Sequence, residues 1–184
     1  MAGRRRPRDA NAGERPAPDA EAAIETAIHF LGARPRTRWE LERRLRRAAA
    51  SDDVIATTLQ RLAKMGYVDD VAFTRWWAEQ RDRHAPRGRR MVEAELRQHG
   101  VPQQVLESLR SSELAEPGRD GEVLPGNETE RARIALERHL KGRALPTDIR
   151  SIQRVGGFLM RRGFDLETVR ATLRSAAAVE ITDD

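Results

Sequence analysis

The chain has 184 residues and no cysteine, and its 34 lysines and arginines exceed its 29 acidic residues to give a net charge of +5. The absence of cysteine excludes a disulfide scaffold, a zinc ribbon, an iron–sulfur centre and a cysteine nucleophile. No apolar run approaches the roughly 18 residues of a membrane span, and the basic first residues lack the apolar stretch of a secretory signal. We therefore expect a soluble cytoplasmic protein that contacts no membrane.

Positive charge is concentrated in three segments. Arginine supplies 32 of the 34 cationic residues, and its planar guanidinium pairs with phosphates and carboxylates. The net charge is +5 over residues 34–47, +3 over 81–97 and +7 over 131–174, against −5 over 107–130 and −3 over 175–184. This separation favours a polyanionic or acidic partner, although each basic run taken alone is more typical of a solvated helix face.

Composition divides the chain into structured and polar segments. Residues 1–20 contain Arg, Pro and Ala with almost nothing to bury, which predicts a disordered basic arm. Residues 111–128 combine Pro, Gly and acids, which predicts an acidic linker, and residues 177–184 are expected to form an acidic tail. The remaining segments are expected to be three helical repeats: residues 21–68, 69–110 and 129–176.

Helical periodicity dominates these repeats. Leu41, Leu45 and Ala48 recur at the spacing of one helix face, and no stretch alternates with the period of a strand. Leu, Ala, Arg and Glu dominate the composition, and all four favour helices. The chain is therefore predicted to be all-α. In chain order, the expected helices lie near residues 21–32, 38–49, 52–65, 70–84, 88–99, 102–110, 129–141, 147–162 and 165–176.

Glycine and aspartate mark the predicted helix ends. A glycine after an apolar periodic run is typical of the left-handed residue that ends a helix, and an aspartate before or at the start of a run is a candidate N-cap. The glycines are Gly66, Gly100 and Gly163, and the aspartates are Asp52, Asp70 and Asp165.

The sequence repeats itself approximately. A shift of 51 residues, followed by a further shift of 63, aligns apolar and turn positions of successive segments. The aligned sets are Leu41, Val92 and Val155; Leu45, Leu96 and Leu159; Ala49, Gly100 and Gly163; and Ile55, Leu106 and Val169. We infer three tandem three-helix-bundle repeats of about fifty residues, each too small to bury a good core alone. Neighbouring repeats must then pack, which predicts an elongated, curved array.

Arginines cluster where the second helix of the first two repeats begins. The first cluster comprises Arg34, Arg36, Arg38, Arg43, Arg44 and Arg47, the second comprises Arg87, Arg89 and Arg90, and a pair, Arg161 and Arg162, precedes Gly163. Arg89 lies 51 residues beyond Arg38, so the repeat keeps a base at that place. These arginines are predicted to meet carboxylates or phosphates of a partner. The alternatives are pairing with nearby glutamates and, for the last pair, complementing the negative end of a helix.

Aromatic residues gather on one predicted helix. Phe73, Trp76 and Trp77 share a helix face, and we interpret them as a buried stripe that joins the first two repeats, with stacking on unpaired bases as the alternative. Trp39, beside Arg38, is expected to be partly exposed.

No residue pattern indicates an enzyme or a metal centre. Asp69 and Asp70 are interpreted as helix-capping residues, because no histidine or third acid is placed to complete a metal site. The four histidines form no HExxH motif, and the glycines lack the strand–glycine–helix context of a phosphate loop. We predict no catalytic residue, no metal ion and no cofactor.

Four segments together resemble the RecX family, regulators of the RecA recombinase. They are FLGARPRTRWELERRLRR (30–47), LQRLAKMGYVDDVAFTRWWAE (59–79), PRGRRMVEAELRQHGVPQQVL (86–106) and FLMRRGFDLETVRATL (158–173). The resemblance is collinear over about residues 25–175. It departs from the family pattern at Ala49-Ala50-Ser51, where a glycine turn is expected, and in the long acidic linker before the third repeat.

The resemblance implies a non-enzymatic negative regulator of RecA. It implies binding in the helical groove of the RecA–DNA filament and inhibition of filament growth, ATPase activity and strand exchange. The processes involved would be DNA repair, recombination and the SOS response. The partners would be the RecA filament and, weakly and without sequence preference, single- and double-stranded DNA, and the chain is expected to act as a monomer.

Two other functions fit the basic helical units. A stand-alone DNA-binding regulator of the helix-turn-helix kind would bind duplex DNA tightly and sequence-specifically, as a dimer on a palindromic site. A scaffold protein would use its arginines only for acidic protein surfaces.

Overall fold

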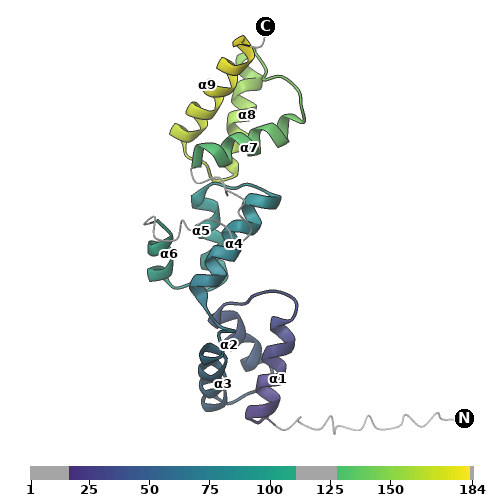
Figure 1. Ribbon diagram of the computed structural model, residues 1–184, viewed down its shortest axis with the longest axis vertical. Coiled ribbons are helices and arrows are strands. Elements are labelled where there is room, and N and C mark those ends of the chain that lie inside the picture. The colour runs from purple at the N-terminus through teal and green to yellow at the C-terminus, as the bar shows by residue number, and fades with distance from the viewer. Residues whose placement is uncertain (1–16, 111–127, 183–184) are drawn as a thin grey trace, which may run out of the picture.

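The computed structural model describes residues 17–110 and 128–182. Most of the predicted basic arm, residues 1–16, and nearly all of the predicted acidic linker, residues 111–127, lie outside the described residues. Within the described ranges the chain is helical, with nine α-helices and no strand. The helices form three groups of three that follow one another along the long axis of the molecule (Figure 1). This confirms the all-α fold of tandem three-helix units and its elongated shape.

The first unit contains α1 (Ala20–Leu31), α2 (Arg38–Arg47) and α3 (Asp52–Lys64). Each helix contributes one apolar face to a shared core, because the apolar residues recur at helical spacing. The buried core residues are Ala23, Ala27, Leu41, Leu45, Ile55, Leu59 and Leu62. Phe30, Leu31 and Val68 cover the edges of this core.

The second unit contains α4 (Asp70–His84), α5 (Arg89–Gln98) and α6 (Gln103–Arg110). Its core is smaller and more aromatic, with Phe73, Val92, Leu96, Val101 and Leu106 buried. Trp76 and Trp77 are half-buried against it. The aromatic stripe on α4 therefore belongs to the core of the second unit.

The third unit contains α7 (Glu128–Leu140), α8 (Ile149–Arg161) and α9 (Leu166–Thr182). Its buried core residues are Ala132, Ala135, Leu136, Leu145, Val155, Leu159, Phe164 and Val169. The extensive helix packing of the described chain lies within the units, and the units meet through short joints. None of the described helices is both long and apolar enough to cross a membrane.

The predicted helix boundaries agree with the observed ones to within two residues, except at the end of the last helix. That helix was expected to end near residue 176 and to be followed by a tail, but α9 continues to Thr182. Ala176, Ala177 and Ala178 favour a helix, and neither glycine nor proline interrupts them. Residues 183–184 lie outside the described part.

Two of the three predicted N-caps are wrong by one residue. Ser51 caps α3, and Asp69 caps α4 by accepting hydrogen bonds from the amides of Val71 and Ala72. Asp52 and Asp70 are instead the first residues of these helices. Asp165 does accept a hydrogen bond from the Thr168 amide at 2.7 Å, as expected for a cap.

In every unit, the turn that follows the second helix contains a residue in the left-handed conformation at an equivalent position. Gly100 and Gly163 have φ angles of +75° and +90°, and the aligned Ala49 has a φ of +63°. The first unit therefore makes the same turn without a glycine, at the steric cost that a Cβ atom adds to this conformation. The departure from the family pattern at Ala49 leaves the backbone geometry of the unit intact.

Candidate partner-binding surface and the joints that support it

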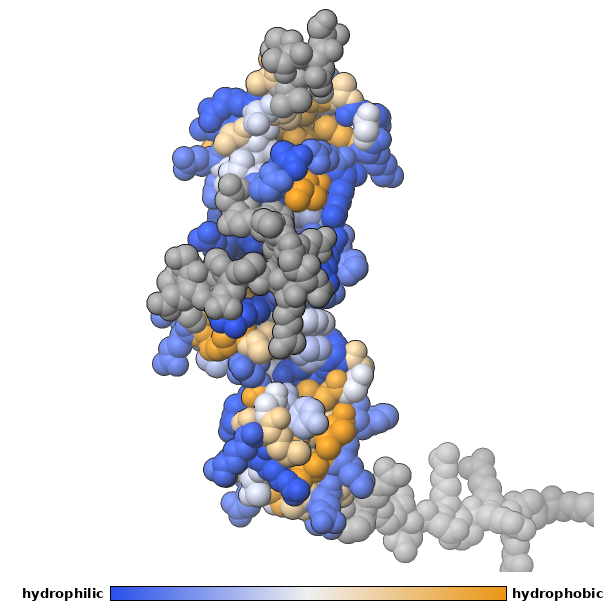
Figure 2. All heavy atoms as spheres, in the orientation of Figure 1, coloured by the Kyte–Doolittle hydropathy of each residue, from blue (hydrophilic) through white to orange (hydrophobic). Residues whose placement is uncertain are grey.

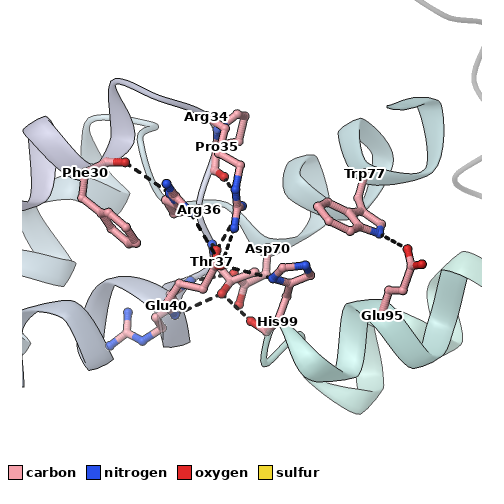
Figure 3. A network of polar contacts seen from close by, with 11 residues as sticks. Phe30, Arg34, Pro35, Arg36, Thr37, Glu40, Asp70, Trp77, Glu95 and His99 are labelled. Carbon is pink, nitrogen blue, oxygen red and sulfur yellow. Dashed lines mark hydrogen bonds and ion pairs between the residues drawn. The ribbon is translucent and has the colours of Figure 1, made fainter. Parts of the chain in front are cut away.

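The first joint connects the start of α2 to the turn that follows α5. Thr37 and Glu40 form a capping box on α2, with the Glu40 amide donating to Thr37 Oγ1 at 3.1 Å. The same hydroxyl donates to the carbonyl oxygen of His99 in the second unit, at 2.6 Å. Thr37 is completely buried, so this hydrogen bond between the units is shielded from water (Figure 3).

Glu40 is the centre of this joint. Its carboxylate accepts two hydrogen bonds from Arg34, at 2.6 and 3.2 Å, and lies 3.1 Å from Nδ1 of His99. Burial raises the pKa of Glu40, but hydrogen bonds from Arg34, the Thr37 amide and His99 outweigh it, so the pKa lies below its ordinary value. The carboxylate therefore remains charged at neutral pH and holds Arg34 and His99 together.

Two further contacts fix the orientation of the first joint. The backbone amide of Arg38 donates to Asp70 Oδ1 at 2.9 Å, so Asp70 links the units instead of capping its own helix. Burial, together with the neighbouring charge of Asp69, raises the pKa of Asp70 despite this hydrogen bond. Trp39 packs over Gly100, since a methyl group at Gly100 would lie 2.4 Å from the indole ring. Trp39 is 41% exposed, as expected.

The second joint repeats the first. The backbone amide of Arg89, which aligns with Arg38, donates to the Glu128 carboxylate at 2.8 Å. Glu128 begins α7, as Asp70 begins α4. The turn after α8 takes the place of the turn after α5, and the amide of Gly88 donates to the Arg162 carbonyl at 2.9 Å. The two joints are therefore built from equivalent positions of successive units.

A buried ion pair adds to the second joint. Arg131 of α7 lies 2.9 Å from Asp82 of α4, whose side chain is only 2% exposed. Burial raises the pKa of Asp82, and the charge of Arg131 lowers it by less. The pair fixes the register of α7 against α4, because an unpaired carboxylate would be costly at this depth.

The predicted arginines separate into an inward and an outward set. Arg34 and Arg36 contact Glu40, Arg87 forms an ion pair with Glu95, and Arg162 donates to the carbonyl of Pro86 at 3.3 Å. These four are half-buried. The outward set is Arg38, Arg43, Arg44, Arg47, Arg89, Arg90 and Arg161, all exposed except the half-buried Arg44. Hydrophilic side chains cover much of the visible face of all three units (Figure 2).

Arg34 also connects the first unit to the aromatic core of the second. Its guanidinium lies 5.7 Å from the centre of the Phe73 ring and 5.9 Å from that of Trp77. Trp77 in turn donates through Nε1 to Glu95 at 2.9 Å. The Trp77 indole is held by these internal contacts, which favours its interpretation as a core residue over base stacking.

The third unit contains a basic groove that the sequence interpretation missed in part. It has a volume of about 730 Å³ and lies between the end of α7, the loop that follows it and one face of α8. Four arginines line it, namely Arg143, Arg150, Arg154 and Arg161, and none of its lining residues is acidic. Of these only Arg161 was predicted. The four-residue spacing of Arg150 and Arg154 on one predicted helix was the available signal.

No group of three or more histidine, aspartate or glutamate side chains suited to a metal ion occurs in the described ranges. The arrangement as a whole defines a class: a tandem helical repeat protein whose units form one extended array with arginines on its outer faces. Such arrays recognise extended partners along their length.

Comparison with known proteins gives the family. Family models described as the first, second and third three-helix domains of RecX match residues 23–62, 69–108 and 127–173. The chain therefore belongs to the RecX family. It is 37% identical over 162 residues to "Regulatory protein RecX" of Thermobifida fusca (strain YX), covering 85% of this chain and 80% of that protein. It is 33% identical over 161 residues to the protein of the same name from Mycolicibacterium smegmatis, with the same coverage.

A solved structure supports the same fold. The crystal structure of RecX from Lactobacillus salivarius superposes with a TM-score of 0.70, covering 87% of this chain and 97% of that one. The sequence identity is 15%, so the likeness concerns the arrangement of the helices alone.

Proposed function

We propose that this chain regulates a RecA-type recombinase by lying along the recombinase–DNA filament and inhibiting its growth, ATPase activity and strand exchange. Family membership supports the class of partner, since the curated relatives are named regulatory proteins. The repeated joint is the observation that best supports the proposal that the chain lies along the filament. It fixes three units in line and places exposed arginines at aligned positions of the first two, Arg38 and Arg89.

The proposal includes the other properties implied for the family. The chain acts without catalysis, as a cytoplasmic monomer, and its affinity for DNA alone is weak and independent of sequence. Exposed guanidinium groups attract phosphates and carboxylates over a distance, so the outward arginines would contribute mainly to association rate and salt sensitivity.

A helix-turn-helix regulator is a weaker alternative. Such proteins place a recognition helix in the major groove with its N-terminal residues on the bases. In the first unit the third helix, α3, begins with Asp52 and Asp53, and phosphates would repel this end. The basic surface lies instead on α2, whose last turn contains Arg44, Arg46 and Arg47.

A charge-reversal experiment tests the proposal. Wild-type chain at stoichiometric concentration is expected to inhibit the DNA-stimulated ATPase activity of a RecA-type recombinase and to cosediment with the filament. The double substitution Arg43→Glu/Arg47→Glu is expected to weaken inhibition about tenfold or more, because two exposed contacts of about 1 kcal/mol each are lost and reversed. Arg43→Lys/Arg47→Lys should recover much of the effect if bulk charge dominates.

Arg61→Glu/Lys64→Glu is the matched control. These exposed cations lie at the end of α3 and change the net charge by the same amount. The control should inhibit like the wild type. Unchanged ATP hydrolysis at an excess of wild-type chain, together with no cosedimentation, would refute the proposed function.

A further inference from the structure

The groove of the third unit has the chemistry of a binding site for an extended polyanion. Its walls are the end of α7, with His139 and Leu140, and a face of α8 that runs from Arg150 to Arg161. Arg143 approaches from the connecting loop. All residues that line the groove belong to the third unit, and none of them makes the contacts described for the two joints.

The arginines of the groove face no lining carboxylate. Arg143 donates to the Leu140 carbonyl at 3.1 Å and Arg154 to the Ser151 hydroxyl at 2.7 Å, and both acceptors are neutral. Asp148 lies outside the lining, at the start of α8, which it caps by accepting from the Ser151 amide. Asp148 also interacts electrostatically with Arg154, so it offsets one of the four positive charges. The groove retains a surplus of guanidinium groups that a phosphate backbone would neutralise.

The arginines form a row and do not converge on one point. Arg150, Arg154 and Arg161 lie on one side of α8 and are separated by roughly 6 and 10 Å along its axis, given the rise of about 1.5 Å per residue. A single phosphate would be held by guanidinium groups that meet at one place. A row of them fits successive phosphates of a chain.

An aromatic surface lies beside this row. The rings of His139 and Phe158 both line the groove and stack on each other, with centroids 3.8 Å apart and planes inclined by 15°. Arg162 lies 4.9 Å from the Phe158 ring, which leaves the exposed His139 as the accessible member of the stack. Unpaired bases stack on such rings, while their backbone follows the adjacent cations.

We propose that this groove binds single-stranded nucleic acid, with Arg150, Arg154 and Arg161 on the phosphates and His139 against a base. An acidic peptide would use the arginines but would leave the aromatic surface unused. This site adds a contact with DNA to the proposed function. It depends on the proposed function only for the source of the strand, which the recombinase filament would supply. The groove would then anchor one end of the array to DNA.

Binding to a fluorescently labelled oligo-dT of about 15 nucleotides, measured by anisotropy with the full chain and no recombinase, tests the groove. Arg150→Ala/Arg154→Ala is expected to raise the Kd about tenfold or more and to reduce the slope of log K against log salt by about 1.4. The matched control is Arg170→Ala/Arg174→Ala, which removes two exposed arginines four residues apart on α9 of the same unit. It should change the Kd less than twofold. Circular dichroism of both variants checks that they remain helical.

Three outcomes would overturn the inference. They are unchanged binding by Arg150→Ala/Arg154→Ala, equal affinity for a duplex of the same length, and displacement of oligo-dT by polyglutamate at equal charge concentration. His139→Ala should weaken binding of oligo-dT but not of an abasic strand of equal length, and a uniform effect would contradict the stacking role. Failure here is distinct from failure of the proposed function, because the proposed function is tested separately, by inhibition of the recombinase ATPase and cosedimentation with the wild-type chain.

Discussion

Gly88→Ala is expected to detach the third unit from the second while each unit keeps its own fold. Gly88 has an ordinary φ of −66°, so alanine adds no backbone strain. Its methyl group, however, would lie 2.2 Å from the carbonyl oxygen of Gly163 and 2.3 Å from the carbonyl carbon. Both are backbone atoms, so no side-chain rotation relieves the clash, and the hydrogen bond from the Gly88 amide to Arg162 must break.

Small-angle scattering and thermal unfolding measure this effect. Overpacking of this kind costs about 1–3 kcal/mol, and the clash opposes the few hydrogen bonds and the one ion pair that hold this joint. The expected result is a broader distribution of interatomic distances and a separate unfolding transition for the third unit. Gly32→Ala is the control, because Gly32 also has an ordinary φ and its added methyl would have a nearest contact of 3.4 Å. A Gly88→Ala variant with wild-type scattering and unfolding would show that the second joint does not exist as described.

Glu40→Gln is expected to destabilise the first joint by about 2 kcal/mol at pH 7. Hydrogen bonds to a charged group contribute about 1.5–3 kcal/mol, and the partial exposure of Arg34 places the effect at the lower part of this range. The amide keeps the shape of the side chain but loses the negative charge that Arg34 and His99 contact. Urea unfolding at pH 7 measures the difference in the free energy of unfolding.

The difference should also depend on pH. The pKa of Glu40 is lower in the folded chain than its ordinary value near 4.5. Its charge therefore stabilises the fold fully above that ordinary value, and the contribution disappears as the pH falls through the lower, folded pKa. Wild type and Glu40→Gln should converge in stability at acidic pH. A difference that stays constant from pH 7 to pH 3 would contradict this account of the joint.

Glu42→Gln provides the matched control on the same helix. Glu42 pairs with Arg46 at 2.8 Å in an i, i+4 ion pair whose arginine is largely exposed. Exposed pairs of this kind contribute only about 0.3–0.5 kcal/mol. The control should therefore lose a small fraction of what Glu40→Gln loses.

The helices and their order could be predicted from the sequence because both depend on local chemistry. Periodic leucines such as Leu41 and Leu45 identify the buried face, and both are fully buried. The alignment of Ala49 with Gly100 and Gly163 correctly placed three equivalent turns, even though alanine is unusual in the left-handed conformation. The alignment of the repeats predicts the position of the turn at Ala49, whereas the residue type alone does not.

The roles of the arginines could not be predicted in the same way. Arg34 and Arg36 pair with Glu40, only six and four residues away, and this is the alternative of pairing with nearby glutamates. Local spacing did not show which arginines would do so, because the joint that buries Glu40 also needs His99, 59 residues further along the chain. Asp69 and Asp70 are adjacent in sequence, and only the position of the Arg38 amide determines which one caps and which one links. The groove of the third unit needs the loop that places Arg143 beside α8, and periodicity does not describe loops.

The most direct test of the central claim is a cryo-microscopy map of this chain bound to a recombinase–DNA filament. The account predicts three contiguous units lying along the filament, joined as they are in the free chain, with Arg38, Arg43, Arg47, Arg89 and Arg90 facing the filament surface. Density for a single bound unit, with the other two projecting into solvent, would contradict it. So would contact through the opposite face, with these arginines exposed to water.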